Sequence, residues 1–235
     1  MKTPFTLLTK HSDCHPSKRG KEIERFGQSD FQNRLGIFMD ILSPESRYGV
    51  HVYERDDLAT ALYRSLANQW QTESGEADWS TTDTLWAEQT GLARRQIDRV
   101  RRSLVQDGLL LHERRGFPAE SWYRVRGVRR RAKTVSEFSY CPGLSRHIGY
   151  KATALFCWLI ELDKHFDTQG YFFHLKMTDI QRSLGLSRYQ VDQARKKLIA
   201  HDLMKERFWG IPAVREFRLR LEGLERLISE GGASQ

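Results

Sequence analysis

The sequence has few of the residues that mark secreted or membrane-spanning proteins. It contains 3 cysteines in 235 residues, at positions 14, 141 and 157, and no Cys-x-x-Cys pair. An odd and scattered set of cysteines builds no disulfide framework and fits a reducing compartment. No apolar run approaches the ~18 residues of a membrane span, and the N-terminus carries only a broken apolar stretch, unlike a signal peptide. We therefore expect a cytoplasmic protein with no membrane partner.

Motifs of common enzymes are missing as well. There is no Gly-x-x-x-x-Gly-Lys-Ser/Thr phosphate loop and no Gly-x-Ser-x-Gly nucleophile turn. His11, Cys14 and His15 are residue types that bind metals, but the sequence offers no fourth well-spaced ligand for structural zinc. We expect no catalytic residues, no cofactor and no metal, and hence a protein that is not an enzyme.

Positive charge is what the chain has in excess, and it is concentrated in one segment. The formal net charge is +8. Between Gly91 and Lys133 there are 13 basic and 4 acidic residues, a net charge of +9 for this segment alone. Clustered arginine and lysine indicate an anionic partner, above all nucleic acid.

A repeat runs through most of the chain. Shifting the sequence by 94 positions places Gly91–Asp98 on Gly185–Asp192, and the register continues without a gap to Val125 and Leu219. Over these 35 aligned positions 12 residues are identical. The turn Gly-Phe-Pro-Ala at 116–119 falls on Gly-Ile-Pro-Ala at 210–213. A duplicated structural unit accounts for this pattern.

Each copy predicts the same order of elements. Apolar residues at helical spacing begin at Leu58 and at Ala152, and each run is followed by a polar stretch. A second helix, capped by Thr82 or Asp83 in one copy and by Thr178 in the other, ends at a glycine. A third helix follows at once, with Ser187 as the cap in the second copy. Two strands then form a hairpin, Leu109–Arg114 with Trp122–Arg126 and Leu203–Phe208 with Glu216–Leu221.

These observations predict a mainly α protein with small β-hairpins, of the α+β class. The expected domains are an N-terminal arm with an amphipathic helix (1–50), a first repeat unit (51–133), a second repeat unit (134–228) and a disordered tail (229–235). The amphipathic helix is indicated by six apolar residues, Phe31, Leu35, Ile37, Phe38, Ile41 and Leu42. It either packs on the first unit or pairs two chains.

The segment from Leu85 to Gly108 resembles the helix–turn–helix pattern of bacterial winged-helix proteins, and the order of elements in each copy is that of a winged helix. Two such units in one chain are architecturally similar to iteron-binding plasmid and phage replication initiators. This resemblance implies double-stranded DNA as the partner, origin repeats as the target, a homodimer, and replication machinery that supplies the helicase. It also implies a place on the bacterial nucleoid or on plasmid DNA.

In a winged helix the third helix lies in the major groove and the hairpin, or wing, rests on the backbone or the minor groove. Arginine can bind guanine and glutamine can bind adenine through two hydrogen bonds. The expected DNA contacts of the first unit and its linker are Arg94, Arg95, Gln96, Arg99, Arg102, Arg114, Arg115 and Arg130. Those of the second unit are Arg188, Tyr189, Gln190, Gln193, Lys197, Arg207 and Trp209. Arg101 lies nearer the buried face, where it either touches phosphate or pairs with Asp98.

Alternatives remain open for function and for the second unit. A transcription regulator that binds an operator has the same composition and fold. A third hypothesis is that the two units bind other proteins, and the excess positive charge between Gly91 and Lys133 argues against it. Tyr189, Phe208 and Trp209 also make the second unit a candidate dimer surface instead of a second DNA reader. For each unit, a basic helix face can also be an ordinary solvated surface.

Overall fold

In the computed structural model the described residues are 33–34, 37–38, 47–54, 56–76, 78–126, 133–166 and 172–232. Over these ranges the chain is a mixed α and β structure with 8 helices and 8 strands in small antiparallel sheets, as the sequence predicts for the α+β class. None of the described helices is both long enough and apolar enough to cross a membrane.

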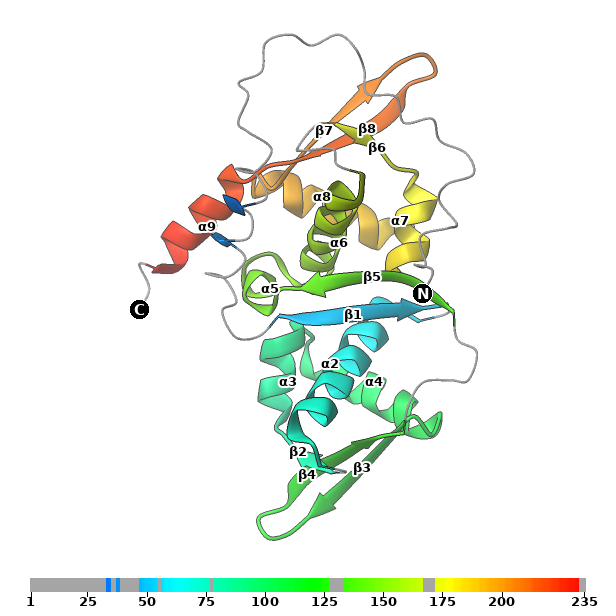
Figure 1. Cartoon of the computed structure of the whole chain (residues 1–235), viewed down its shortest axis with the longest axis vertical. Coiled ribbons are helices and arrows are strands. Elements are labelled where there is room, and N and C mark those ends of the chain that lie inside the picture. The colour runs from blue at the N-terminus through cyan, green and yellow to red at the C-terminus, as the bar shows by residue number, and fades with distance from the viewer. Residues whose placement is uncertain are drawn as a thin grey trace.

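Two units follow one another along the chain, with the same order of elements except for one additional short helix, α5, in the second (Figure 1). The first consists of β1 (Tyr48–Tyr53), α2 (Leu58–Ser74), β2 (Trp79–Ser80), α3 (Asp83–Thr90), α4 (Arg94–Gln106), β3 (Leu110–Arg115) and β4 (Glu120–Val125). The second consists of β5 (Thr134–Tyr140), α5 (Pro142–Ile148), α6 (Tyr150–Phe166), β6 (Phe173–His174), α7 (Met177–Leu184), α8 (Arg188–Ala200), β7 (Met204–Trp209) and β8 (Val214–Leu219). A final helix, α9 (Glu222–Gly232), follows.

Most of the predicted helix ends are confirmed. The Thr82 hydroxyl accepts a hydrogen bond from the Leu85 amide at the start of α3, and the Ser187 hydroxyl accepts one from the Gln190 amide at the start of α8. Gly91 and Gly185 end α3 and α7 in the left-handed conformation. The prediction of Thr178 as a cap was wrong, because α7 begins two residues earlier than that cap implies and Lys176 occupies the cap position.

Some elements differ from the sequence expectation. β1 spans residues 48–53 and so crosses the expected boundary between residues 50 and 51. The helix α9 continues to Gly232, although a disordered tail was expected from residue 229. β1, β5 and the seven-residue α5 were not expected at all. The predicted amphipathic helix lies largely outside the described residues, of which 33–34 and 37–38 are helical.

A central two-stranded ribbon joins the two units. β1 and β5 pair antiparallel, with Tyr48 opposite Tyr140 and Val50 opposite Phe138. α2 packs against β1 and α6 packs against β5. In Figure 1 the ribbon crosses the middle of the molecule between these helices. The buried apolar residues of both units form one continuous core, so the chain folds as a single body about this ribbon.

Two contacts across the ribbon are reciprocal. A Cβ placed at Gly91, in the α3–α4 turn, would lie 2.7 Å from Ser145 Oγ and 3.2 Å from Tyr150 Cβ of the second unit. A Cβ placed at Gly185, in the α7–α8 turn, would lie 2.2 Å from the Asp56 carbonyl oxygen of the first unit. Each turn therefore packs on the segment that opens the long helix of the other unit. Such an exchange is the mark of an approximate twofold arrangement.

Candidate nucleic-acid interface

The first candidate surface is the solvent face of α4. Arg95, Arg99, Arg102 and Gln106 recur every three or four residues and are all exposed, whereas Ile97, Val100 and Leu104 on the opposite face are buried. We call the exposed residues Arg95, Arg99 and Arg102 the arginine stripe. Arg99 pairs with Asp57 at 2.9 Å, and the Arg102 Nε donates to the Asp98 carbonyl at 3.2 Å. Arg99 is 61% exposed despite that pair. The stripe therefore presents three guanidinium groups to solvent.

Arg94 and Arg101 lie on the neighbouring face of the same helix, but in different surroundings. Arg94 is 82% exposed and lies 3.9 Å from Asp83, a distance at which its charge is largely solvated. Arg101 is only 11% exposed and pairs with both Asp83 and Asp98. It also donates to the Tyr123 hydroxyl at 2.9 Å. Arg101 is thus a structural residue that ties α4 to the start of α3 and to β4, and its predicted pair with Asp98 is confirmed.

The second unit repeats this structural arginine. Arg195 aligns with Arg101, is 8% exposed at its side chain, and pairs with Asp192 at 3.0 Å and with Glu206 of β7. Asp192 aligns with Asp98 in the repeat. The identity at these aligned positions therefore reflects how each third helix is held against its own unit.

Gln96 and Gln190, both expected to contact bases, are engaged in helix capping. The Gln96 Oε1 accepts from the Ala93 amide at 3.0 Å, and the Gln190 Oε1 accepts from the Ser187 amide at 2.9 Å. Such bonds close the first turn of a helix. The Gln96 amide group also donates to the Tyr150 hydroxyl at 2.9 Å. Both ends of Gln96 are therefore used, so the repeated Arg-x-Gln is a capping signal.

The matching face of α8 is chemically different. Tyr189, Gln193 and Lys196 align with the three members of the arginine stripe, and all three are exposed. Tyr189 is 72% exposed. Arg188, at the start of the helix, is also exposed. Lys197 donates from Nζ to the Ile148 carbonyl at 3.4 Å, which turns its amine toward the α5–α6 junction. We call Tyr189, Gln193 and Lys196 the mixed stripe.

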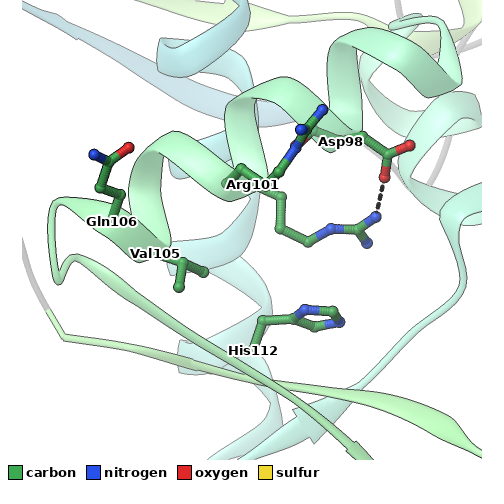
Figure 2. A pocket seen from close by; sticks show the side chains of 6 residues that line it. Asp98, Arg101, Val105, Gln106 and His112 are labelled. Atoms are coloured by element: carbon green, nitrogen blue, oxygen red, sulfur yellow. Dashed lines mark hydrogen bonds and ion pairs between the residues drawn. The ribbon is translucent and has the colours of Figure 1, made fainter.

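A groove lies between α4 and the strand β3 (Figure 2). Its volume is about 540 Å³. The lining residues come from α4 and β3 and are Asp98, Arg101, Arg102, Val105, Gln106 and His112. Figure 2 shows Arg101 extending from α4 toward β3, paired with Asp98 and above the His112 ring. Burial, reinforced by the Arg101 charge, lowers the pKa of His112 and so disfavours the charged form of this imidazole.

The hairpin arginines are paired to different extents. Arg114, on β3, is exposed. Arg115 pairs with Asp78 at 2.8 Å and with Glu113 at 2.7 Å, and the pKa of Asp78 is lowered by hydrogen bonds from Arg124 and Arg115. Since its charge is compensated by two carboxylates, Arg115 offers less uncompensated positive charge to an anion than Arg114.

The second hairpin carries aromatic residues where the first carries arginines. Phe208 and Trp209 align with Arg114 and Arg115, and they are 60% and 55% exposed. Arg207 pairs with Glu216 at 2.7 Å and lies 4.0 Å over the Phe172 ring and 5.2 Å from the Trp209 ring. This hairpin therefore offers stacking surfaces in place of free guanidinium groups.

Sequence analysis missed one pair of exposed residues. Phe117 and Ile211, in the turns of the two hairpins, are completely exposed, at 103% each. The signal was present, because both belong to the repeated Gly-x-Pro-Ala turn, but periodicity cannot distinguish an exposed apolar residue from a buried one. Arg130 lies outside the described residues, as do its neighbours 127–129 and 131–132 and the residues His11, Cys14 and His15.

The chain matches no protein-family model and no curated protein sequence. Over the described part of the chain no group of three or more histidine, cysteine, aspartate or glutamate side chains is arranged to hold a metal. The candidate interface is thus defined by its geometry alone: two aligned helix faces, two hairpins and the groove beside α4.

Proposed function

We propose that this chain binds double-stranded DNA through two tandem winged-helix modules, with α4 and α8 as the reading helices. The observation that carries the proposal is the pair of aligned, exposed stripes on these two helices. Their buried faces are alike, whereas their exposed residues are arginines in one copy and tyrosine, glutamine and lysine in the other. The aligned buried positions keep their apolar character while the exposed positions change in chemical type, a pattern that fits two readers with different targets.

The chemistry of the stripes supports unequal roles for the two helices. Arginine binds phosphate strongly and binds guanine through two hydrogen bonds, so α4 supplies both affinity and guanine recognition. On α8, Gln193 can pair with adenine, Lys196 can bind phosphate, and the exposed Tyr189 supplies a flat aromatic face. We propose Arg94, Arg95, Arg99, Arg102 and Arg114 as contacts of the first unit. Those of the second unit are Arg188, Tyr189, Gln193 and Lys196.

The central ribbon supports a composite target of two half-sites. Because β1 and β5 join the units into one core, α4 and α8 keep a fixed relation. DNA-binding proteins with paired reading helices demand a matching spacing between half-sites. One chain should therefore require two half-sites at a single separation, and inserting base pairs between them should abolish tight binding.

The proposed biological setting is replication initiation, with the chain bound to origin repeats of a plasmid, phage or mobile element. The alternative is a transcription regulator that binds an operator. Selection of bound genomic fragments by the purified full chain distinguishes the two. Direct repeats in an origin indicate initiation, whereas a single palindrome beside a promoter indicates regulation.

The DNA-binding proposal is tested by fluorescence anisotropy on a selected fragment, with Arg99→Ala as the first variant. Arg226→Ala, on α9, is the matched control. Arg226 is 57% exposed and pairs with one carboxylate at 3.1 Å, much as Arg99 is 61% exposed and pairs at 2.9 Å. We expect Arg99→Ala to weaken binding by about 1–3 kcal/mol if it contacts a base, and Arg226→Ala to have little effect.

Salt dependence gives a second measure of the same proposal. The logarithm of the binding constant should fall linearly with the logarithm of salt concentration, and each lost phosphate contact should reduce that slope by about 1. A flat salt response, or unchanged affinity after replacing all three arginines of the stripe with alanine, would refute DNA binding by α4.

A further inference from the structure

The tips of the two hairpins share a feature that their own folding does not require. Phe117 and Ile211 hold the same position in the repeated Gly-x-Pro-Ala turn, and both are completely exposed. An apolar side chain in this position buries no surface and so contributes nothing to the core. The tips lie at opposite ends of the long axis of the molecule (Figure 1).

A single exposed apolar residue is ordinary on a protein surface, but this pair has a more specific pattern. The strand ends beside the tips have diverged from Arg114 and Arg115 to Phe208 and Trp209, whereas the tip has stayed large and apolar in both copies. Neither packing nor strand pairing accounts for that retention, because pairing ends at Arg115 and at Trp209. The apolar character of the tip residue is thus independent of which residues occupy the strand ends beside it.

Both tips follow directly on paired strand ends, and cationic groups lie nearby. The strands pair up to the residues next to each turn, with Arg115 opposite Glu120 and Trp209 opposite Val214. The proline that follows each apolar residue fixes its own φ and so restricts the turn. Guanidinium groups lie over aromatic rings of the hairpins: the Arg115 guanidinium is 5.4 Å from the centre of the Trp122 ring, and that of Arg215 is 5.0 Å from the centre of the Phe208 ring.

We propose that Phe117 and Ile211 are apolar wedges that enter the DNA minor groove at the two ends of the bound site, separate stacked base pairs there and bend the duplex. This inference rests on the proposed DNA binding. Minor-groove proteins insert phenylalanine, isoleucine or proline between base steps to make such bends. The arginines on the first hairpin, Arg114 above all, are placed to bind phosphates beside the groove. Flexible steps such as TA or CA should therefore recur under the tips.

The test measures DNA bending by energy transfer between dyes at the two ends of a selected duplex, with the full chain bound. We expect the wild type to bend the duplex. Phe117→Ala and Ile211→Ala should each remove about half of the bend, and the double variant nearly all of it, because each tip forms one wedge. The double variant should still bind, since the stripes are unchanged.

Two controls separate a wedge from a general change in the hairpin. The double variant Phe117→Leu with Ile211→Leu retains apolar tips and should keep the bend. Ala119→Ser with Ala213→Ser alters the same turns without touching the wedges, and should behave as wild type. Both tips are fully solvated, so unchanged thermal melting confirms that all variants remain folded.

The possible results distinguish this inference from the function on which it rests. An unbent wild-type complex, or a bend that survives the double alanine substitution, overturns the wedge proposal and leaves DNA binding intact. If the wild type binds no duplex at all in the salt titration, both proposals fail. The wedge proposal is supported if the double alanine variant loses the bend and the double leucine variant retains it.

Discussion

Gly185 offers a direct test of the contact that couples the two units. Its φ is +61°, a conformation that costs an L-residue about 1–2 kcal/mol. A Cβ at this position would also lie 2.2 Å from the Asp56 carbonyl oxygen, whereas ordinary contacts begin near 3.4 Å. The backbone of the first unit would have to retreat by about 0.8 Å for this separation to reach 3.0 Å, the shortest that real Cβ atoms show. Gly185→Ala should therefore strain its own turn and separate it from the first unit.

The expected loss is the sum of two effects. Left-handed strain contributes about 1 kcal/mol after allowing for the lower entropy of the unfolded alanine chain, and overpacking against backbone contributes about 1–3 kcal/mol more. We expect Gly185→Ala to lower the free energy of unfolding by about 2–4 kcal/mol, measured by urea denaturation monitored by circular dichroism. Gly91→Ala should fall lower in this range, because its shortest contact is 2.7 Å to a side-chain oxygen, that of Ser145, and not 2.2 Å to a backbone oxygen.

Gly75→Ala is the matched control for this series. Gly75 ends α2 with φ +64°, but nothing lies within 4 Å of a Cβ placed there. This variant should show the strain alone, about 1 kcal/mol. If Gly185→Ala destabilises the protein no more than Gly75→Ala, the packing of the α7–α8 turn on Asp56 contributes nothing, and the argument for a fixed relation between the units fails.

Two further predictions concern side chains that hold α4 and α8 in place. Asp83 accepts hydrogen bonds from Arg101, which lower the pKa of Asp83 below its usual 3.8 although partial burial opposes this. The difference in free energy of unfolding between wild type and Asp83→Asn should be largest at neutral pH and should shrink as the pH falls through the lowered pKa. A difference that grows in acid would contradict this prediction. Ser187 caps α8 with its hydroxyl, whereas the equivalent Ala93 has none. Ser187→Ala should cost about 1 kcal/mol and Ala93→Ser should gain a similar amount in urea denaturation, and equal stabilities of all three proteins would refute the capping argument.

Much of each unit could be predicted from local sequence. The register of 94 residues, the helical spacing of Ile97, Val100 and Leu104, and the glycines that end α3 and α7 all depend on neighbours along the chain. Backbone sterics and side-chain periodicity act over a few residues, so the features that depend on them can be predicted from the sequence without a structure. The exposed stripe on α4 follows from the same periodicity.

The joining of the units could not be predicted in this way. β1 and β5 are separated by the entire first unit, and Tyr48 meets Tyr140 only because two apolar faces come together in the folded chain. Neither strand carries a pattern that specifies its partner, and the seven-residue α5 is too short to show helical periodicity. The fixed relation of α4 to α8 is therefore a property of tertiary packing.

The sequence by itself determined that two similar units exist, where most of their helices begin and end, and which face of each third helix is polar. Only the tertiary structure decided which polar residues on those helices are free. Arg101 and Arg195 are bound to carboxylates of other elements, and Gln96 is held by Ala93 and Tyr150. The physical reason is that periodicity sets the direction of a side chain, whereas its partners come from segments brought near it by folding.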